Sequence, residues 1–376
     1  MKSLPAGLAP SLSLAGLLAL AVLPSVLTAQ IGYRQKNLVS DIPELAVHTD
    51  PNLINPWGIS AGPATPFWVS NAGSGNTTLY NTSGTPLPLV VTIPHPAGGP
   101  SVPTGQVFNS STAFNGDRFL FASARGTIAG WRGALGTTAE TLIDNSAAGA
   151  AYLGLAIAND GTNNYLYAAD FARNRIDAFD GTGASVLAGG FIDPTLPSDY
   201  APFNIQNIGG RLFVAYAKQG LGEEEPGPGF GLVNTFDLQG NLLGRFASGG
   251  VLNAPWGFAL APDSFGQFGG DLLVGNFGDG TINAFDFGTG DLVGTLKDNL
   301  GNPLVIEGLW GLQFGNGGQG GKLGTLYFAA GIDDERHGLF GSITPVPEPS
   351  TYAALAAAGL LALIAYRKRT RTLASV

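Results

Sequence analysis

The sequence predicts an all-β protein, a six-bladed β-propeller, and three observations lead to this prediction. Short runs of aromatic and β-branched residues, which favour strands, are bounded by Gly, Asn and Asp, which favour hairpin turns. Glycine occurs 57 times among the 376 residues, and charged residues make up only 12% of them, so the composition favours turns over helices. One strand-like run also recurs six times along the chain.

The recurring run predicts the second strand of each blade. Its copies read FWVSN, FLFAS, LYAAD, LFVAY, LLVGN and LYFAA, and they end at Asn71, Ser123, Asp170, Tyr216, Asn276 and Ala330. Successive copies are 46 to 60 residues apart. That spacing leaves room for about four strands in each unit, as a propeller blade requires. A β-helix would need much shorter repeats.

A second motif precedes each of these runs and predicts the first strand of each blade. It places a small or aromatic residue and Gly before an apolar run, as in NPWGIS from Asn55 and APWGFALA from Ala254. YLGLAIA and GLWGLQFG are further copies, PTGQVFN is a weaker one, and APFNIQNI has Asn204 in place of the Gly. A third run often ends in a turn, as in RIDAFDGTG.

The sixth unit ends at Pro345 without a fourth strand. The segment YRQKNLVSDI, from Tyr33 to Ile42, resembles the outer runs of the other units. We therefore expect the N-terminal strand to complete the last blade. Such closure removes the exposed sheet edges that invite aggregation.

The two ends of the chain predict export and a membrane-associated tail. Lys2, the apolar run from Leu12 to Leu23 and the small residues before Gln30 predict a signal peptide over 1–29; a buried helix is the alternative. The apolar segment from Tyr352 to Tyr366 has 15 residues. As a helix it would cover ~22 Å, short of the ~30 Å hydrocarbon core, so it could span only with help from flanking residues such as Arg367 and Lys368. We therefore expect a short transmembrane helix that anchors the protein in the inner membrane only transiently. The expected domains are 1–29, a propeller over 30–345, and a tail over 346–376.

The tail carries three ordered features: Pro347, Glu348 and Pro349, then the apolar segment, then a basic end containing Arg367, Lys368 and Arg369. In this order they resemble the PEP-CTERM sorting signal. The resemblance implies a Gram-negative bacterium that makes extracellular polysaccharide. It also implies an exosortase that reads the tail and processes the protein for attachment to the cell surface or for release.

Two of the units resemble NHL repeats: the segment from Leu166 to Gly183 and the segment from Leu272 to Gly290, which has Thr281 where the family's Arg would stand. The resemblance implies a structural pair between Asp170 and Arg175. The whole chain resembles an uncharacterised family of exported, PEP-CTERM-tailed propellers. That resemblance implies a fold and a location, and no activity.

Composition excludes several classes of function. The net charge is −9, and five of the 18 basic residues lie in the terminal segments, so the acidic body repels nucleic acid and we expect none as a partner. The chain has no cysteine, which excludes disulfides, thiolate zinc sites and a Cys nucleophile. Its three histidines are scattered, and no His-based triad is visible.

The expected ligand site lies at one mouth of the channel. In propellers, the ends of the second strands and the starts of the first strands share one face. This arrangement groups amides, a carboxylate and flat rings, which suit a sugar ligand. The residues are Trp57, Asn71, Asp170, Tyr216, Trp256, Asn276 and Trp310. The structural alternative is that the Trp rings are wedges packed between blades and that Asp170 only supports the fold.

These observations favour a non-catalytic binding protein, exported to the cell surface or released, that contacts extracellular polysaccharide or the biofilm matrix. The alternative is a metal-dependent lactonase or hydrolase of the gluconolactonase-like type, with Asn71, Asp170 and Asn276 around Ca²⁺. No other cofactor is expected. The acidic segments EEEPGPG and DDER have no EF-hand spacing and are expected to be solvated loops.

Overall fold

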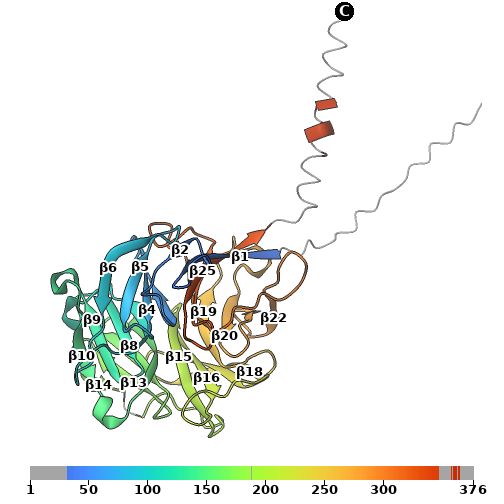
Figure 1. Ribbon diagram of the computed structural model, residues 1–376. Helices are drawn as coiled ribbons and strands as arrows, with labels where there is room; N and C mark the ends of the chain where they lie inside the picture. The colour runs from blue at the N-terminus through green and yellow to red at the C-terminus, as the bar shows by residue number, and fades with distance from the viewer. Residues whose placement is uncertain (1–31, 188, 347–356, 358, 362, 365–376) are drawn as a thin grey trace, which may run out of the picture.

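The computed structural model describes residues 32–187, 189–346, 357, 359–361 and 363–364. Six sheets are arranged around a central axis (Figure 1). Within each sheet, strands that follow one another in the chain pair antiparallel, apart from one short parallel pair in the sixth sheet. The predicted six-bladed propeller is therefore confirmed.

Blades one to five each contain four consecutive strands, and the first strand of each lines the central channel. The strands of blades one and two are β3 (Pro56–Ser60), β4 (Phe67–Asn71), β5 (Asn76–Tyr80), β6 (Pro86–Thr92), β7 (Pro103–Phe108), β8 (Phe119–Ser123), β9 (Thr127–Trp131) and β10 (Glu140–Asp144). Those of blades three to five are β11 (Tyr152–Asn159), β12 (Asn164–Asp170), β13 (Arg175–Asp180), β14 (Ser185–Val186), β15 (Tyr200–Ile208), β16 (Arg211–Lys218), β17 (Gly231–Phe236), β18 (Leu242–Ser248), β19 (Pro255–Leu260), β20 (Leu272–Asn276), β21 (Ile282–Phe285) and β22 (Leu292–Thr295).

The sixth blade combines both ends of the domain. Its strands are β23 (Leu309–Phe314), β24 (Leu326–Ala330), β25 (Leu339–Val346), β1 (Gly32–Ser40) and β2 (His48–Thr49). β1 pairs antiparallel with β25 along its whole length, from Gly32 opposite Val346 to Ser40 opposite Leu339. The predicted closure by the N-terminal strand is confirmed. The short β2, which pairs parallel with β1, adds a fifth strand that the repeat pattern did not predict.

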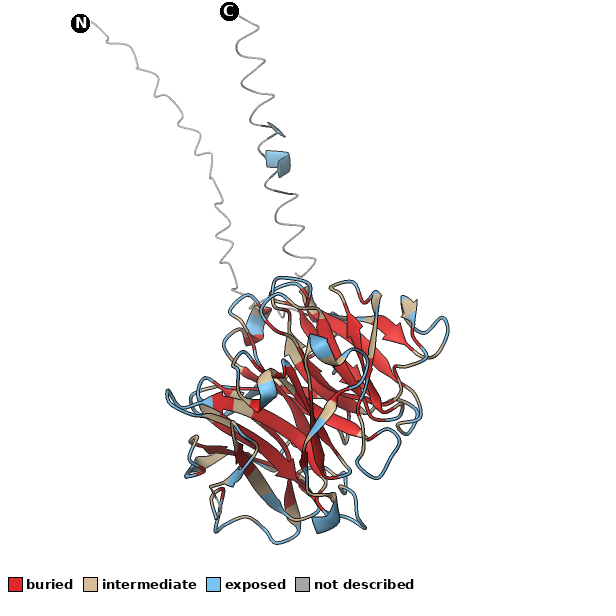
Figure 2. Ribbon diagram, turned by 90° about the vertical axis from the view of Figure 1, so that its left-hand side faces the viewer, coloured by how far each residue is buried: buried red, intermediate tan, exposed pale blue. Residues whose placement is uncertain are grey.

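The core lies between neighbouring blades, where the strands are buried on both faces and the loops are exposed (Figure 2). Tyr33 shows how β1 joins two blades. Its ring lies 5.0 Å from that of Phe265 and 5.8 Å from that of Phe268, and its hydroxyl donates to the Phe265 carbonyl at 3.0 Å. Because both partners belong to blade five, the N-terminal strand attaches blade six to its neighbour.

Helix is confined to four single 3-10 turns within residues 32–346, excluding 188: Phe114–Gly116, Gly133–Leu135, Ser146–Ala148 and Gly266–Phe268. Among the described residues, no helix is both long enough and apolar enough to cross a membrane. The predicted signal peptide, the Pro-Glu-Pro motif and the basic end lie outside the described residues.

Tyr33→Ala tests the closure of the ring. We expect it to lower the free energy of unfolding by about 3–5 kcal/mol, because it removes a buried ring and its hydrogen bond. Urea unfolding of the full chain in detergent measures this. Arg34→Ala, at an exposed position of the same strand, is the control and should change stability by less than ~0.5 kcal/mol. Equal stability of the two variants would contradict the closing role of β1.

Candidate functional site

A β-bulge interrupts the pairing of the first two strands at the same place in all six blades. It falls next to the Gly of the first-strand motif, or next to Asn204 in blade four. A bulge adds one residue and redirects its side chain out of the regular pleat. The residues immediately before the Gly or Asn are Trp57, Thr104, Leu153, Phe203, Trp256 and Trp310.

Five of these side chains meet at the axis and form what we call the axial plug: Trp57, Leu153, Phe203, Trp256 and Trp310. The rings of Trp57 and Trp310 stack at 3.4 Å, and the edge of Trp256 meets Trp310 at 5.8 Å. Trp310 is completely buried, and Trp57 is only 7% exposed. Because the plug residues come from five different blades, they fill the centre of the ring.

Glycine lets the inner strands approach closely enough to build this plug. A Cβ atom on Gly58 would lie 2.6 Å from the Thr104 carbonyl oxygen, and one on Gly311 would lie 2.4 Å from the Trp57 carbonyl oxygen. Both distances are shorter than van der Waals contact. The Gly of the motif is therefore required by the approach of the next blade. We call these positions, with Asn204 in blade four, the glycine ring.

A second apolar layer covers the plug on the face that carries the turns between second and third strands, which we call the mouth face. Phe277, directly after β20, stacks on Trp310 at 4.0 Å. Phe171, directly after β12, lies 5.4 Å from Phe203. Ala72 follows β4 in the same way and belongs to the same cluster. The channel is thus closed by apolar groups on the side where the sequence predicted a ligand.

The polar residues predicted for this mouth are brought to the same end of the blades, but they are bonded inside their own blades. The Asn71 amide donates to Asn76 Oδ1 at 2.8 Å and to Thr78 Oγ1 at 3.0 Å. The Asn276 amide donates to the Val251 carbonyl at 2.7 Å, and its oxygen accepts the backbone N–H of Asn253 at 3.2 Å. Each therefore fastens the hairpin or the incoming loop to the second strand.

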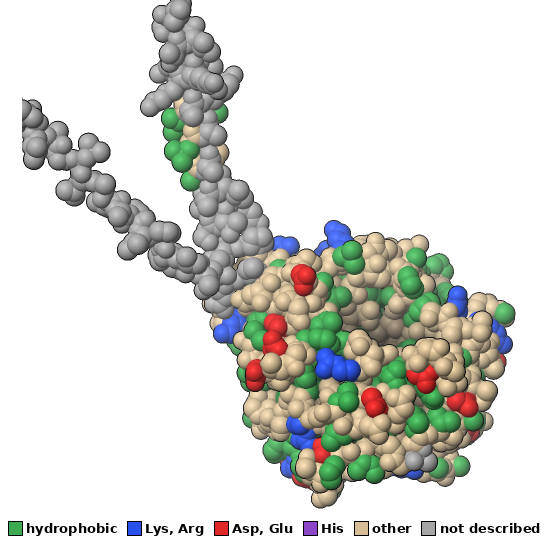
Figure 3. All heavy atoms as spheres, turned by 180° about the vertical axis from the view of Figure 1, so that it is seen from behind, with side chains coloured by type: hydrophobic (Ala, Val, Ile, Leu, Met, Phe, Trp, Pro, Cys, Tyr) green, Lys and Arg blue, Asp and Glu red, His purple; other side chains and the backbone are tan. Residues whose placement is uncertain are grey.

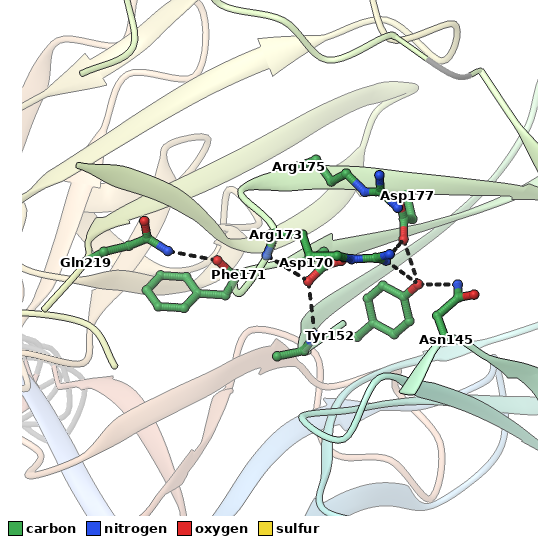
Figure 4. Close-up of polar contacts among 9 residues, drawn as sticks. Asn145, Tyr152, Asp170, Phe171, Arg173, Arg175, Asp177 and Gln219 are labelled. Atoms are coloured by element: carbon green, nitrogen blue, oxygen red, sulfur yellow. Dashed lines mark hydrogen bonds and ion pairs between the residues drawn. The ribbon is translucent and has the colours of Figure 1, made fainter. Parts of the chain in front are cut away.

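Asp170 anchors a polar network between β12 and the following turn (Figure 4). It accepts the Ala151 N–H at 3.0 Å and forms an ion pair with Arg173. Arg173 also contacts Asp177 at 2.5 Å, and Asp177 accepts the Tyr152 hydroxyl at 2.7 Å.

The predicted pair between Asp170 and Arg175 is wrong. Arg175 bonds Asp177 at 2.7 Å, whereas Arg173 takes the place beside Asp170. The physical reason is the turn: Asp170 also accepts the backbone N–H of Arg173 at 3.3 Å, which brings that residue's side chain back onto the carboxylate.

All seven residues predicted for the ligand site are buried, with Asn71, Asp170, Asn276 and Trp310 completely so. Tyr216 is 3% exposed and packs between blades three and four, where burial raises the pKa of its hydroxyl. The three Trp side chains are at most 7% exposed and pack against one another, so they present no open ring face at the mouth. The structure therefore supports the structural alternative for these rings.

The mouth face carries a pocket of about 740 Å³, which we call the mouth pocket and which the sequence did not lead us to expect. The segments EEEPGPG and DDER, expected to be separate solvated loops, meet in it because blades four, five and six are neighbours. Its acidic lining residues are Glu223, Glu224, Asp279, Glu307, Asp334 and Glu335, with no Lys or Arg among the lining residues. Burial raises the pKa of Glu224 to about 7 and also raises that of Glu335. One sequence signal could have predicted this pocket. Acidic residues follow the second strands of three consecutive repeats, at Glu224, Asp279 and Asp334.

The channel continues below the plug as a second cavity of about 200 Å³, which we call the channel pocket. It is lined by the first strands of all six blades, from the glycine ring towards the face opposite the mouth. None of its lining residues is charged. Figure 3 shows a hollow in the molecular surface with uncharged walls and the charged side chains lying around it.

Within the described residues, no three His, Asp or Glu side chains lie close enough together to hold a metal ion. The carboxylates of the mouth pocket thus line its walls without converging on one point. Chemically, the mouth pocket suits positive charge, whereas the channel pocket offers hydrogen bonds and apolar contact.

Comparison with known proteins identifies the tail and the family. The model of the PEP-CTERM protein-sorting motif matches residues 345–369, which confirms the predicted sorting signal. The chain is 36% identical to the uncharacterized protein R648 of Acanthamoeba polyphaga mimivirus, over 85% of this chain and 81% of that protein. It belongs to the same family. Protein L690 of the same virus is 34% identical over 85% of this chain and 86% of its own length.

Among solved structures, a glucose dehydrogenase superposes with a TM-score of 0.51 at 14% identity, over 82% of this chain and 98% of that one. Such a likeness reflects the shared propeller fold. The family relationship thus covers 85% of the chain, and the sorting motif identifies the tail.

Trp310→Ala tests whether the Trp rings serve the fold. We expect a loss of about 3–5 kcal/mol in the free energy of unfolding, because a completely buried ring leaves a cavity at the axis. Trp131→Ala, at the partly exposed end of β9, is the matched control and should cost clearly less. Urea unfolding of the two full-length variants makes the comparison. If Trp310→Ala unfolded at the same urea concentration as the wild type, the plug would not stabilise the ring of blades.

Proposed function

We propose that this protein is an exported, surface-associated binding protein without catalytic activity, which contacts extracellular polysaccharide or another component of the matrix around the cell. The axial plug is the observation that carries the proposal. It fills the channel on the mouth side with apolar side chains, in the region where the sequence placed the polar ligand residues. A centre filled by buried aromatic and aliphatic side chains favours binding elsewhere on the surface over chemistry at the axis.

The alternative, a metal-dependent lactonase or hydrolase, requires Asn71, Asp170 and Asn276 to share one cation. Each of these side chains is buried and bonded inside a different blade. Freeing them would break the bonds that fasten three separate hairpins and loops. This cost supports the binding function over the metal-dependent enzyme.

The tail supports the proposed location. The PEP-CTERM motif implies export and a membrane-associated sorting tail, and it is a signal for processing by an exosortase. Attachment to the surface, or release from it, after this processing is part of the proposal. In the proposed function the tail delivers the protein, and the propeller makes the contact with the matrix.

Retention on the producer's own polysaccharide tests the binding function. We expect the full chain, purified in detergent, to sediment with that polymer and to do so equally well after treatment with EDTA. An unrelated protein carrying the same tail, residues 346–376, is the control and should stay in solution. Absence of sedimentation would refute the proposed function, and loss of sedimentation in EDTA would favour a metal-dependent role.

Replacing Pro347, Glu348 and Pro349 with Ala tests the processing of the tail. We expect the variant to accumulate in the membrane fraction, whereas the wild type reaches the surface or the medium. The motif lies beyond the last strand, so the variant's propeller should unfold at the wild-type urea concentration. Immunoblots of cell fractions provide the measurement. Unchanged release would show that the exosortase does not depend on these three residues.

A further inference from the structure

We propose that the channel pocket binds a single uncharged sugar ring at the end of a polysaccharide chain. This inference rests on the proposed function, since it names the site and the ligand class through which the protein contacts its polymer. Three observations carry it: the pocket opens to the surface, two of its carboxamides have no hydrogen-bond partner among the described residues, and its walls carry no charge.

The pocket opens on the face opposite the mouth. Gly58 and Gly311, in the glycine ring, are buried, whereas Ile157 and Gln313, further along their strands, are partly exposed. The plug forms the closed end, and Trp256 belongs to both the plug and the pocket wall. A ligand therefore enters from the ends of the inner strands and stops at the plug.

Two carboxamides provide hydrogen bonds that the fold does not use. Gln206 on β15 and Gln313 on β23 each lie two residues after the glycine ring and line the pocket. Their backbones pair with the neighbouring strands, but within the described residues their side-chain carboxamides make no hydrogen bond. Gln106 and Asn204 line it too, but their amides donate to the carbonyls of Gly58 at 3.0 Å and Trp256 at 2.6 Å. A free carboxamide both donates and accepts, as a sugar hydroxyl does.

The remaining wall suits the apolar faces of a sugar. Val107, Phe108 and Ile157 are partly exposed and line the pocket beside the carboxamides. Aromatic and aliphatic groups cover the C–H faces of a sugar ring, and a few polar groups fix its orientation. Because none of the lining residues is charged, an ionised ligand would lose hydration here without gaining a partner.

The size of the pocket points to one ring. Its volume of about 200 Å³ corresponds to roughly seven water molecules at ~30 Å³ each. It lies below the range of ~300–1,000 Å³ that is typical of drug-sized ligands. The channel is closed at the plug, so a polymer cannot pass through it. Only the end of a chain fits.

Isothermal titration of the full chain with glucose, galactose, mannose and N-acetylglucosamine, and with glucuronic acid as the charged counterpart, tests the inference. We expect at least one neutral sugar to bind and glucuronic acid not to bind. Gln206→Ala and Gln313→Ala should each weaken that binding by roughly 3- to 10-fold, because each removes about one hydrogen bond. Gln313→Glu keeps the shape of the side chain and adds charge, so it should weaken binding further.

Gln239→Ala, in an exposed turn between β17 and β18, is the matched control and should bind as the wild type does. The inference is overturned if no neutral sugar binds, or if both channel variants bind it unchanged. Sedimentation with the polysaccharide distinguishes failure of this inference from failure of the proposed function. A chain that sediments with the polymer while its channel variants sediment equally well binds through another surface, whereas a chain that does not sediment refutes both.

Discussion

The close approach of the six inner strands around the axis is the constraint on which the rest of the structure depends. At Gly105 a Cβ atom would lie 2.6 Å from the backbone nitrogen of Leu155, and at Gly257 it would lie 2.5 Å from the Trp310 carbonyl oxygen. Strands this close leave no room for regular side chains on the facing side. The bulge next to each position turns the neighbouring side chain towards the axis, where large rings fill the remaining space. Glycine and tryptophan in the motif thus have complementary roles.

This constraint divides the molecule into two different faces. The plug and the Phe side chains above it close the mouth, so the mouth pocket lies to one side of the axis, in the loops of blades four to six. The opposite end stays open, because the side chains after the glycine ring are mostly small or aliphatic. The protein therefore presents an acidic pocket on the mouth face and an uncharged hollow on the opposite face. Their chemistry differs enough that one ligand class does not suit both.

The repeats made most of the fold predictable. Strand order, blade number and the closing strand follow from motifs that recur at a regular spacing. Such motifs can be recognised in the sequence because the hydrophobic pattern of a strand involves only neighbouring residues. The orientation of the Trp rings was not predictable in this way, because a bulge changes the direction of a side chain by inserting one residue. From its position in the sequence, Trp57 was expected to face the mouth of the channel. The bulge instead directs its side chain against Trp310. The recurring Trp-Gly pair was the only signal of that geometry.

The pairing of the acidic loops and the role of Arg173 were unpredictable for another reason. Glu224 and Glu335 are 111 residues apart, and they share a pocket only because the ring brings blades four and six to either side of blade five. Arg173 and Arg175 are both plausible partners of Asp170 from sequence, and the conformation of one turn decides between them. Such choices depend on the three-dimensional positions of side chains that the repeat pattern does not encode.

The topology also determines which face the tail leaves from. β25 and β23 both pair antiparallel with β24, so they run in the same direction. β23 ends beside the open end of the channel pocket, and Val346, at the end of β25, therefore lies on that same face. β1 and β25 lie side by side there (Figure 1), and the matched sorting motif begins at residue 345. In the proposed function, the chain thus continues towards its sorting motif from the face on which the channel pocket opens.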